Sequence, residues 1–316
     1  MSNTADALDF VITREHQRFA EFCEACRRYR YIGVCYGPPG VGKTLSARHY
    51  ANWPLIEACS PYSFASDTEL AALVGSQTVF YTPKVVNSPR QIEQDIQLWR
   101  NRLRAIPLEV IRREKEEALE VARQQDMVSQ QEFFLQTIET LYAPPAERPA
   151  KPESQVFHVA KTYAQKYEET PEPTTLLMID EADRLKTAGL EQVRDIFDQG
   201  SLGVVLIGIP GLEKRLSRYP QLYSRVGFVH AFRPLNAEGV RDLFRRQWLP
   251  AGIVLPDEGL HHDAVMTTII RITGGNFRLL HRLLTQVARL VEINALSRVA
   301  REVVEGARES LVIGAV

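Results

Sequence analysis

The octet GPPGVGKT at residues 37–44 constrains the fold of this chain more than any other stretch of its sequence. It fits the pattern GxxxxGK[ST], and it lies between the apolar run 32–36 and a segment of helical character at 43–51. In such a turn the glycines let backbone N–H groups surround a phosphate, and the N-terminus of the following helix adds a favourable dipole. The octet therefore predicts a phosphate-binding loop, made of Gly37, Pro38, Pro39, Gly40, Val41, Gly42, Lys43 and Thr44.

A second stretch, TTLLMIDEADRL, supplies the acids that such a loop needs. Its apolar residues 176–179 predict a buried central strand, and Asp180 follows at the carboxyl end, where an acid can hold Mg²⁺. Glu181 is placed to polarise an attacking water, Lys43 to reach the β- and γ-phosphates, and Thr44 to ligate the metal. The two motifs together predict ATP hydrolysis, with ATP and Mg²⁺ bound at one site.

Apolar runs that recur along the chain predict a parallel sheet. Further strand candidates lie at 78–81, 175–179, 204–207 and 228–232, and helical patterns separate them. Because strands and helices alternate, we expect an α/β fold: a P-loop NTPase core at 1–235 whose parallel sheet carries helices on both faces. From Asn236 onward the pattern is helical throughout, which predicts a small all-α lid domain at 236–316.

Two stretches do not belong to a minimal α/β domain. Residues 88–142 are rich in charge and predict two or three long helices inserted into the core. The segment APPAERPAKPE, at about 143–153, predicts a proline-rich linker. We therefore expect a separate helical element to interrupt the nucleotide-binding domain.

Composition and charge exclude several classes of protein. No run approaches the roughly 18 apolar residues of a membrane span, and the N-terminus lacks the features of a signal peptide, so we expect a cytoplasmic protein without a membrane partner. Four cysteines make no disulfide framework in 316 residues. The CxxC of Cys23 and Cys26 has no second ligand pair at zinc spacing, so we interpret both as incidental thiols. With a formal charge of −1, a nucleic-acid surface would need locally concentrated cations.

Three blocks downstream of the loop carry a family resemblance. They are LLMIDEADRLKTAGLEQVRDIFDQGSLGVVLIGIPGLEKRL, YPQLYSRVGF and GGNFRLLHRLL. The chain resembles the AAA+ superfamily in these blocks, and within it the transposition ATPases TnsC and TniB, with MuB as a more distant relative. The resemblance covers about 13–295 except for the charged stretch after Ser88, and it implies an AAA+ core followed by a helical lid.

The resemblance implies roles for two arginines. Arg225 of LYSRV matches an arginine finger, which enters a neighbouring subunit and stabilises charge on the γ-phosphate, and Arg218 is the nearby alternative. Arg278 of GGNFR matches the second sensor, a lid arginine that contacts the nucleotide. For each arginine, a salt bridge between lid and base is the alternative interpretation. At Ile209, where the family often presents a polar first sensor, this chain offers no side-chain donor, which favours slow hydrolysis.

The resemblance also implies what the ATP is used for. The related ATPases assemble as rings or helical filaments on double-stranded DNA, mark a target site and recruit or activate a transposase. A target-selection protein is a further candidate partner. We therefore predict an ATP-dependent, DNA-binding regulator of transposition that acts as a homo-oligomer.

One basic stretch is a candidate DNA contact. Lys84 and Arg90 match the place where the related ATPases insert an element that tracks the DNA backbone. Residues 84–104 hold five basic and two acidic side chains, a net charge of +3. An ordinary solvated loop is the alternative interpretation.

Two other function classes fit the same nucleotide site. One is an AAA+ ATPase of another branch, such as a secretion ATPase or a replication loader, which would differ in its partner. The other is a nucleotide-gated interaction protein with little turnover, whose charged helices and linker form the working surface. His261, His262 and Trp248 are interpreted as lid surface and lid core rather than as site residues.

Overall fold

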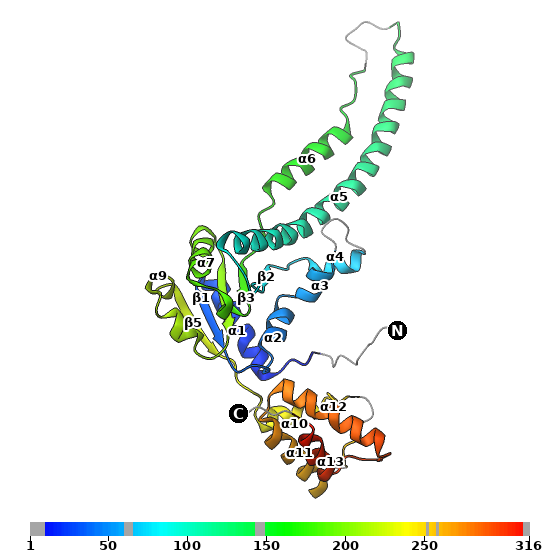
Figure 1. Ribbon diagram of the computed structural model, residues 1–316. Coiled ribbons are helices and arrows are strands. Elements are labelled where there is room, and N and C mark those ends of the chain that lie inside the picture. Colours follow the sequence, from blue (N-terminus) through cyan, green and yellow to red (C-terminus); the bar gives the residue numbers. More distant parts are fainter. Residues whose placement is uncertain (1–9, 60–65, 143–148, 251–252, 257–258, 312–316) are drawn as a thin grey trace. The chain divides into compact units, whose positions relative to one another are not determined.

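The computed structural model describes residues 10–59, 66–142, 149–250, 253–256 and 259–311 (Figure 1). Backbone contacts divide the chain into two compact units. The core unit comprises residues 1–54, 78–96 and 175–316, and the arm unit comprises residues 55–77 and 97–174. Of the predicted proline-rich linker, residues 143–148 lie outside the described residues.

The core unit is built on five parallel strands, as the sequence predicts. Their spatial order is β2-β3-β4-β1-β5, so that β1, which leads into the phosphate-binding loop, lies between β4 and β5. Every residue of β2, β3 and β4 is buried, as expected for strands whose two faces are covered. The bounds are β1 (Ile32–Tyr36), β2 (Thr78–Tyr81), β3 (Leu176–Ile179), β4 (Gly203–Gly208) and β5 (Val226–Ala231).

Three strands differ from the expectation at their ends, and the strand predicted at 175–179 begins one residue later, at Leu176. The predicted strand 204–207 is longer, because Gly203 and Gly208 pair with β3 and β1 although they add nothing to the apolar pattern. The strand predicted at 228–232 begins two residues earlier, where Val226 pairs with Ile32, and it ends one residue earlier, at Ala231. Backbone pairing therefore extends beyond the apolar residues that revealed the strands.

Helix α1 (Arg14–Tyr29) packs closely against the sheet. Its first turn is capped by Thr13, whose hydroxyl accepts a hydrogen bond from the N–H of His16 at 3.1 Å. A Cβ atom added to Gly33 of β1 would lie 2.3 Å from Sγ of Cys26, so only glycine fits beneath this helix. Cys23 and Cys26 are both buried in α1, where burial raises the pKa of each thiol.

The other elements of the core unit connect the strands or follow the last of them. The helices α2 (Lys43–Tyr50) and α7 (Thr187–Gln199), the 3-10 turn η2 (Ala182–Arg184), and α8 (Leu212–Leu216) and α9 (Pro220–Tyr223) connect the strands. The last helices are α10 (Ala237–Arg245), α11 (Leu260–Thr273), α12 (Phe277–Ile293) and α13 (Arg301–Glu309). These last helices share one apolar core, which includes Leu243, Ile269, Leu283 and Val304.

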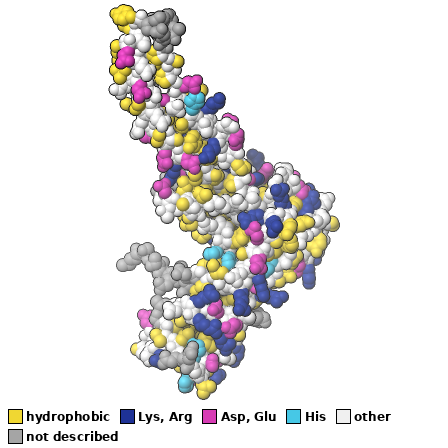
Figure 2. Space-filling view, turned by 180° about the vertical axis from the view of Figure 1, so that it is seen from behind, with side chains coloured by type: hydrophobic (Ala, Val, Ile, Leu, Met, Phe, Trp, Pro, Cys, Tyr) yellow, Lys and Arg dark blue, Asp and Glu magenta, His cyan; other side chains and the backbone are white. Residues whose placement is uncertain are grey.

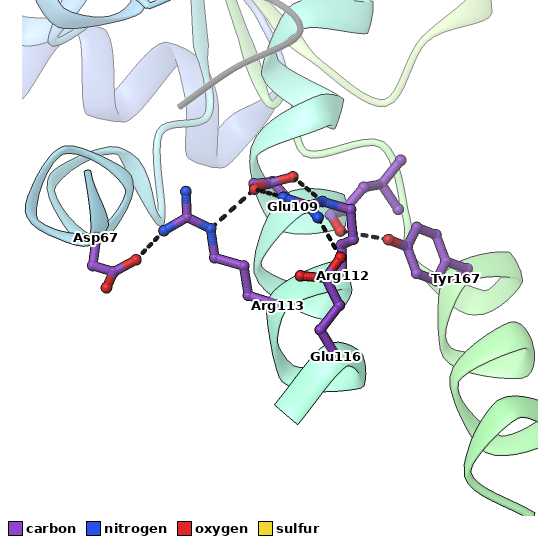
Figure 3. Close-up of polar contacts among 7 residues, drawn as sticks. Asp67, Glu109, Arg112, Arg113, Glu116 and Tyr167 are labelled. Atoms are coloured by element: carbon purple, nitrogen blue, oxygen red, sulfur yellow. Dashed lines mark hydrogen bonds and ion pairs between the residues drawn. The ribbon is translucent and has the colours of Figure 1, made fainter. Parts of the chain in front are cut away.

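The arm unit contains one long helix where the sequence predicted two or three. Helix α5 (Pro89–Glu139) is continuous over 51 residues, and its residues from 97 onward belong to the arm. Pro107 lies inside it without ending it, although proline usually interrupts a helix. Ion pairs one turn apart support the following turns: Arg112 pairs with Glu109 and Glu116, and Arg113 pairs with Glu109 (Figure 3).

Helix α6 (Gln155–Glu169) is attached to α5 by polar contacts rather than by an apolar core. None of its residues is buried. Asp126 accepts hydrogen bonds from the Ser154 hydroxyl at 2.6 Å and from the N–H of Gln155 at 2.7 Å. The Tyr167 hydroxyl donates to the carbonyl of Leu108 at 3.0 Å (Figure 3). The arm also contains α4 (Asp67–Leu73), and α3 (Trp53–Ala58) leads into it. No helix in the described part of the chain is long and apolar enough to cross a membrane.

Candidate functional site

The octet forms the loop between β1 and α2. Gly40 and Gly42 have φ angles of +82° and +103°, a region that side chains disfavour, so the turn depends on both glycines. A Cβ atom at Gly37 would lie 2.2 Å from the carbonyl oxygen of Phe232, beside β5. Gly42 precedes α2 without any side-chain cap, so the first N–H groups of this helix stay available to an anion.

Lys43 and Thr44 extend from the start of α2 toward the carboxyl ends of the strands. Nζ of Lys43 donates to the carbonyl oxygens of Gly37 at 2.6 Å and Pro38 at 2.9 Å. Burial lowers the pKa of this ammonium. The Thr44 hydroxyl donates to Oδ2 of Asp180 at 2.7 Å. Lys43 is therefore held above the loop and Thr44 beside the acid at the end of β3.

The residues at the end of β3 fit a magnesium ion. Asp180 is 4% exposed, and this burial raises the pKa of its carboxyl group, although the hydrogen bond from Thr44 lowers it. A hard divalent cation prefers carboxylate and hydroxyl oxygens, and both are present here within hydrogen-bond distance of each other. A bound cation would also compensate the buried negative charge of Asp180.

Glu181 is at the same edge but its carboxylate is paired with an arginine. Its backbone is left-handed, with φ +49°, and its N–H donates to Oδ1 of Asp180 at 2.9 Å. The carboxylate forms an ion pair with Arg184, and Arg184 also donates to the carbonyl oxygen of Pro83 at 3.0 Å. Glu181 therefore lines the pocket, while its charged end is held by Arg184.

Asp183 is a site residue that the sequence reasoning missed. Its Oδ2 accepts a hydrogen bond from the N–H of Ile209 at 2.8 Å, and a Cβ atom at Gly208 would lie 2.3 Å from the same oxygen. The carboxylate thus sits against the end of β4, at the position where Ile209 offers no polar side chain. Its place in DEADRL, three residues after Asp180, was the available signal.

The start of α12 meets the loop from the other side. The N–H of Arg278 donates to the carbonyl oxygen of Gly40 at 3.1 Å, and Nδ2 of Asn276 donates to that of Pro39 at 2.8 Å. The loop, the acids of β3 and this helix enclose a pocket of about 690 Å³. Arg278 lines it together with residues that were not predicted, namely Trp248, Phe277, His281 and Arg282.

Trp248 packs in the lid as expected, but it has a second environment that the sequence did not reveal. Trp248 is half-buried and packs against the apolar core of the C-terminal helices, but it also lines the nucleotide pocket. Its ring makes an edge-to-face contact with Phe277, with centroids 5.8 Å apart. An isolated tryptophan in a helical region gave no indication of this second environment.

Four of the predicted cations lie away from the pocket. Arg225 precedes β5 and pairs with Asp198 of α7 at 2.6 Å. Arg218 is exposed in the turn after α8, Lys84 is exposed after β2, and Arg90 is exposed in the first turn of α5. A role for any of them at the nucleotide site therefore requires another subunit or a partner.

Comparisons with known proteins agree with the fold. Residues 26–216, more than half of the chain, match the family of AAA domains. A Staphylococcus aureus protein described as a potential ATP-binding protein is 37% identical over 313 residues, which cover 97% of each chain. The RuvB Holliday junction branch migration motor of Thermotoga maritima has a similar fold, with a TM-score of 0.51 and 15% identity over 96% of this chain and 71% of that one. The Orc1 protein of Aeropyrum pernix, solved in complex with DNA, gives a TM-score of 0.50 and 17% identity over 97% of this chain and 68% of that one. The chain therefore belongs to the AAA-domain family of P-loop ATPases.

Proposed function

We propose that this protein is an ATP-dependent regulator of DNA transposition. It hydrolyses ATP slowly, assembles as a homo-oligomeric ring or filament on double-stranded DNA, and recruits or activates a transposase. The observation that carries the nucleotide part is the convergence of the loop, Asp180 and Arg278 on one pocket. The transposition part rests on the resemblance of the blocks containing ADRL and VRDIFD to TnsC and TniB.

In this proposal each residue of the pocket has a distinct role. Nζ of Lys43 exchanges the loop carbonyls for oxygens of the β- and γ-phosphates. Thr44 and Asp180 hold Mg²⁺, which when bound neutralises charge on these phosphates. Glu181 leaves Arg184 and accepts a hydrogen bond from the attacking water, and Arg278 contacts the nucleotide from α12.

The residues at the ends of β3 and β4 are the reason to expect slow ATP turnover. The side chain of Ile209 cannot donate to the γ-phosphate or orient the water, and its N–H already donates to Asp183. Glu181 must also break an ion pair before it can act. Both features favour a long-lived ATP-bound state, which suits an assembly that marks a site more than a fast motor.

The proposed partners are DNA and a transposase, with a target-selection protein as a further candidate. Arg225 acts in trans as the arginine finger in this proposal, and Lys84 and Arg90 contact DNA phosphates. The fold is compatible with DNA binding, since one protein of the same fold was solved in complex with DNA. Oligomeric assembly would repeat a weak cationic site along the duplex and so raise affinity.

A nucleotide-gated interaction protein is the second candidate, and the arm favours it. The C-terminal half of α5 exposes several apolar side chains to solvent, and hydrophobic side chains are visible on this part of the molecule in Figure 2. Exposed apolar patches are typical of protein interaction surfaces. They are Val121, Met127, Val128, Phe134, Leu135 and Ile138, each more than half exposed.

The nucleotide part is tested with a pair of variants. Lys43→Ala should abolish ATP binding, because it removes the ammonium group that is held above the loop carbonyls. Glu181→Gln should retain binding and lose turnover by about 100-fold or more, as expected when a positioned base is removed. Equal loss of ATP binding in both variants would show that Glu181 is not the base.

Co-sedimentation with plasmid DNA in ATP, ADP or no nucleotide tests the DNA part. ATP-dependent co-sedimentation of wild type, enhanced in Glu181→Gln, is the expected result. Turnover without DNA binding in any nucleotide would favour an AAA+ ATPase of another branch, and negligible turnover without DNA binding would favour the interaction protein.

A further inference from the structure

The arginine proposed as the trans finger is held by contacts within its own subunit. Nε of Arg225 donates to Oδ1 of Asp198 at 2.6 Å and Nη2 donates to Oδ2 at 2.7 Å, a two-point pairing of guanidinium and carboxylate. Nη1 donates to the carbonyl oxygen of Gln221 and lies 3.5 Å from the hydroxyl of Ser224. While these contacts persist, each of the three guanidinium nitrogens of Arg225 donates to an acceptor in its own subunit, which holds the side chain away from a neighbouring γ-phosphate.

Asp198 has a second arginine within reach. Arg194 lies one turn earlier on α7, and its Nε is 3.9 Å from Oδ2 of Asp198, too far for a hydrogen bond. This Nε is buried and has no hydrogen-bond partner among the described residues. The Nη1 atom of the same guanidinium is held by Glu191 at 2.8 Å and by the side chain of Gln221, which fixes its position. A buried donor without a partner is unfavourable, so Arg194 gains if Asp198 turns toward it.

We propose that Asp198 is a latch that holds Arg225 in its own subunit until ATP bound to a neighbouring subunit takes the arginine. This inference rests on the proposed role of Arg225 in trans. When Arg225 leaves, a shift of about 1 Å brings Asp198 within hydrogen-bond distance of Nε of Arg194. The carboxylate exchanges one guanidinium for the other and is not left unpaired.

The exposure of the pair makes the latch weak enough to open. The side chains of Arg225 and Asp198 are 32% and 37% exposed, so water and salt screen their attraction. A triphosphate carries more negative charge than one carboxylate and therefore competes well for the guanidinium. The latch thus raises the protein concentration at which ATP-dependent assembly begins, and it has no effect once the arginine is engaged.

The variant Asp198→Asn tests this by removing the charge and keeping the size of the side chain. ATP turnover per subunit is measured against protein concentration. The half-activating concentration is expected to fall about three- to fivefold, the range of an exposed ion pair, while turnover at saturating protein is unchanged. Asp195→Asn is the matched control, because Asp195 lies on the same helix and accepts from Gln199 at 2.6 Å rather than from an arginine.

Arg194→Gln should shift the threshold in the opposite direction, because Asp198 then has no second partner when Arg225 leaves. A purely structural pair would lower stability in Asp198→Asn without lowering the half-activating concentration. If that concentration is unchanged or raised while Arg225→Ala abolishes turnover, the latch is wrong and the finger stands. If Arg225→Ala turns over ATP like wild type, the trans role fails and the latch fails with it.

Discussion

Replacing Gly40 with alanine tests how firmly the phosphate-binding loop is joined to α12. The φ angle of +82° costs an alanine about 1–2 kcal/mol. In addition, the new Cβ would lie 2.6 Å from Oδ1 of Asn276 and 2.8 Å from Cβ of Arg278. Asn276 cannot move away freely, because the same oxygen caps α12 by accepting from the N–H groups of Arg278 and Leu279.

Separation of the loop from α12 is the cheapest relief of this clash. It sacrifices the hydrogen bonds from Asn276 to Pro39 and from Arg278 to Gly40, each contributing about 1 kcal/mol. With the backbone strain, Gly40→Ala should lose about 3–4 kcal/mol of unfolding free energy. ATP affinity should fall as well, because Arg278 leaves the pocket.

Gly42→Ala is the matched control in the same loop. Gly42 also has a positive φ angle, +103°, but the nearest atom to its added Cβ is Cδ2 of Phe277 at 3.5 Å, an ordinary contact. This variant should lose only the backbone term of about 1–2 kcal/mol. Urea unfolding of both variants, followed by circular dichroism, measures the difference. Equal losses would refute the argument that Gly40 is required by the close approach of α12.

Two further predictions concern the DNA contact and the arm. The double variant Lys84→Glu with Arg90→Glu should strongly weaken DNA binding, measured by filter binding across a range of salt concentrations. The ATP affinity of the subunit should be unchanged, because neither residue lines the pocket. DNA binding equal to that of wild type would exclude this stretch as the contact. In the arm, the hydrogen bond from Arg112 lowers the pKa of Glu109 from 4.5 to about 2, so the stabilisation by Glu109 is present above pH 4.5 and is lost as the pH falls toward 2. Wild type and Glu109→Gln should therefore differ in helix stability above pH 4.5, and this difference, followed by circular dichroism, should disappear as the pH falls toward 2. A stability difference that does not change with pH would contradict the prediction.

Local patterns were enough to locate the strands and the phosphate-binding loop. Parallel strands that are buried on both faces consist of short apolar runs, and β1, β2 and β3 were found within one residue of their bounds. Gly40 and Gly42 indicate a turn, because only glycine adopts their positive φ angles without a steric cost. Asp180 follows directly from the end of a buried strand.

Local patterns failed where a longer structure overrides them. Residues 88–142 were predicted to form two or three helices, whereas α5 is one helix of 51 residues with Pro107 inside it. In the structure, ion pairs such as Arg112 to Glu109 and a run of strong helix formers support the helix on the far side of the proline. The loss of one backbone hydrogen bond was too small to end it.

The sequence by itself therefore determined the fold class and the phosphate-binding motif. The alternating strands, the glycine-rich loop and the acids that follow β3 are local features, because side-chain periodicity and glycine geometry act over a few residues. The tertiary structure alone decided the partners of each charged group. It placed Asp183 on the N–H of Ile209, Trp248 beside the nucleotide pocket and Arg225 on Asp198. These contacts join residues 26 and 27 positions apart, or elements from opposite ends of the core unit, and no periodic pattern links such positions. They depend on the order in which the strands and helices pack, which burial of the whole core selects.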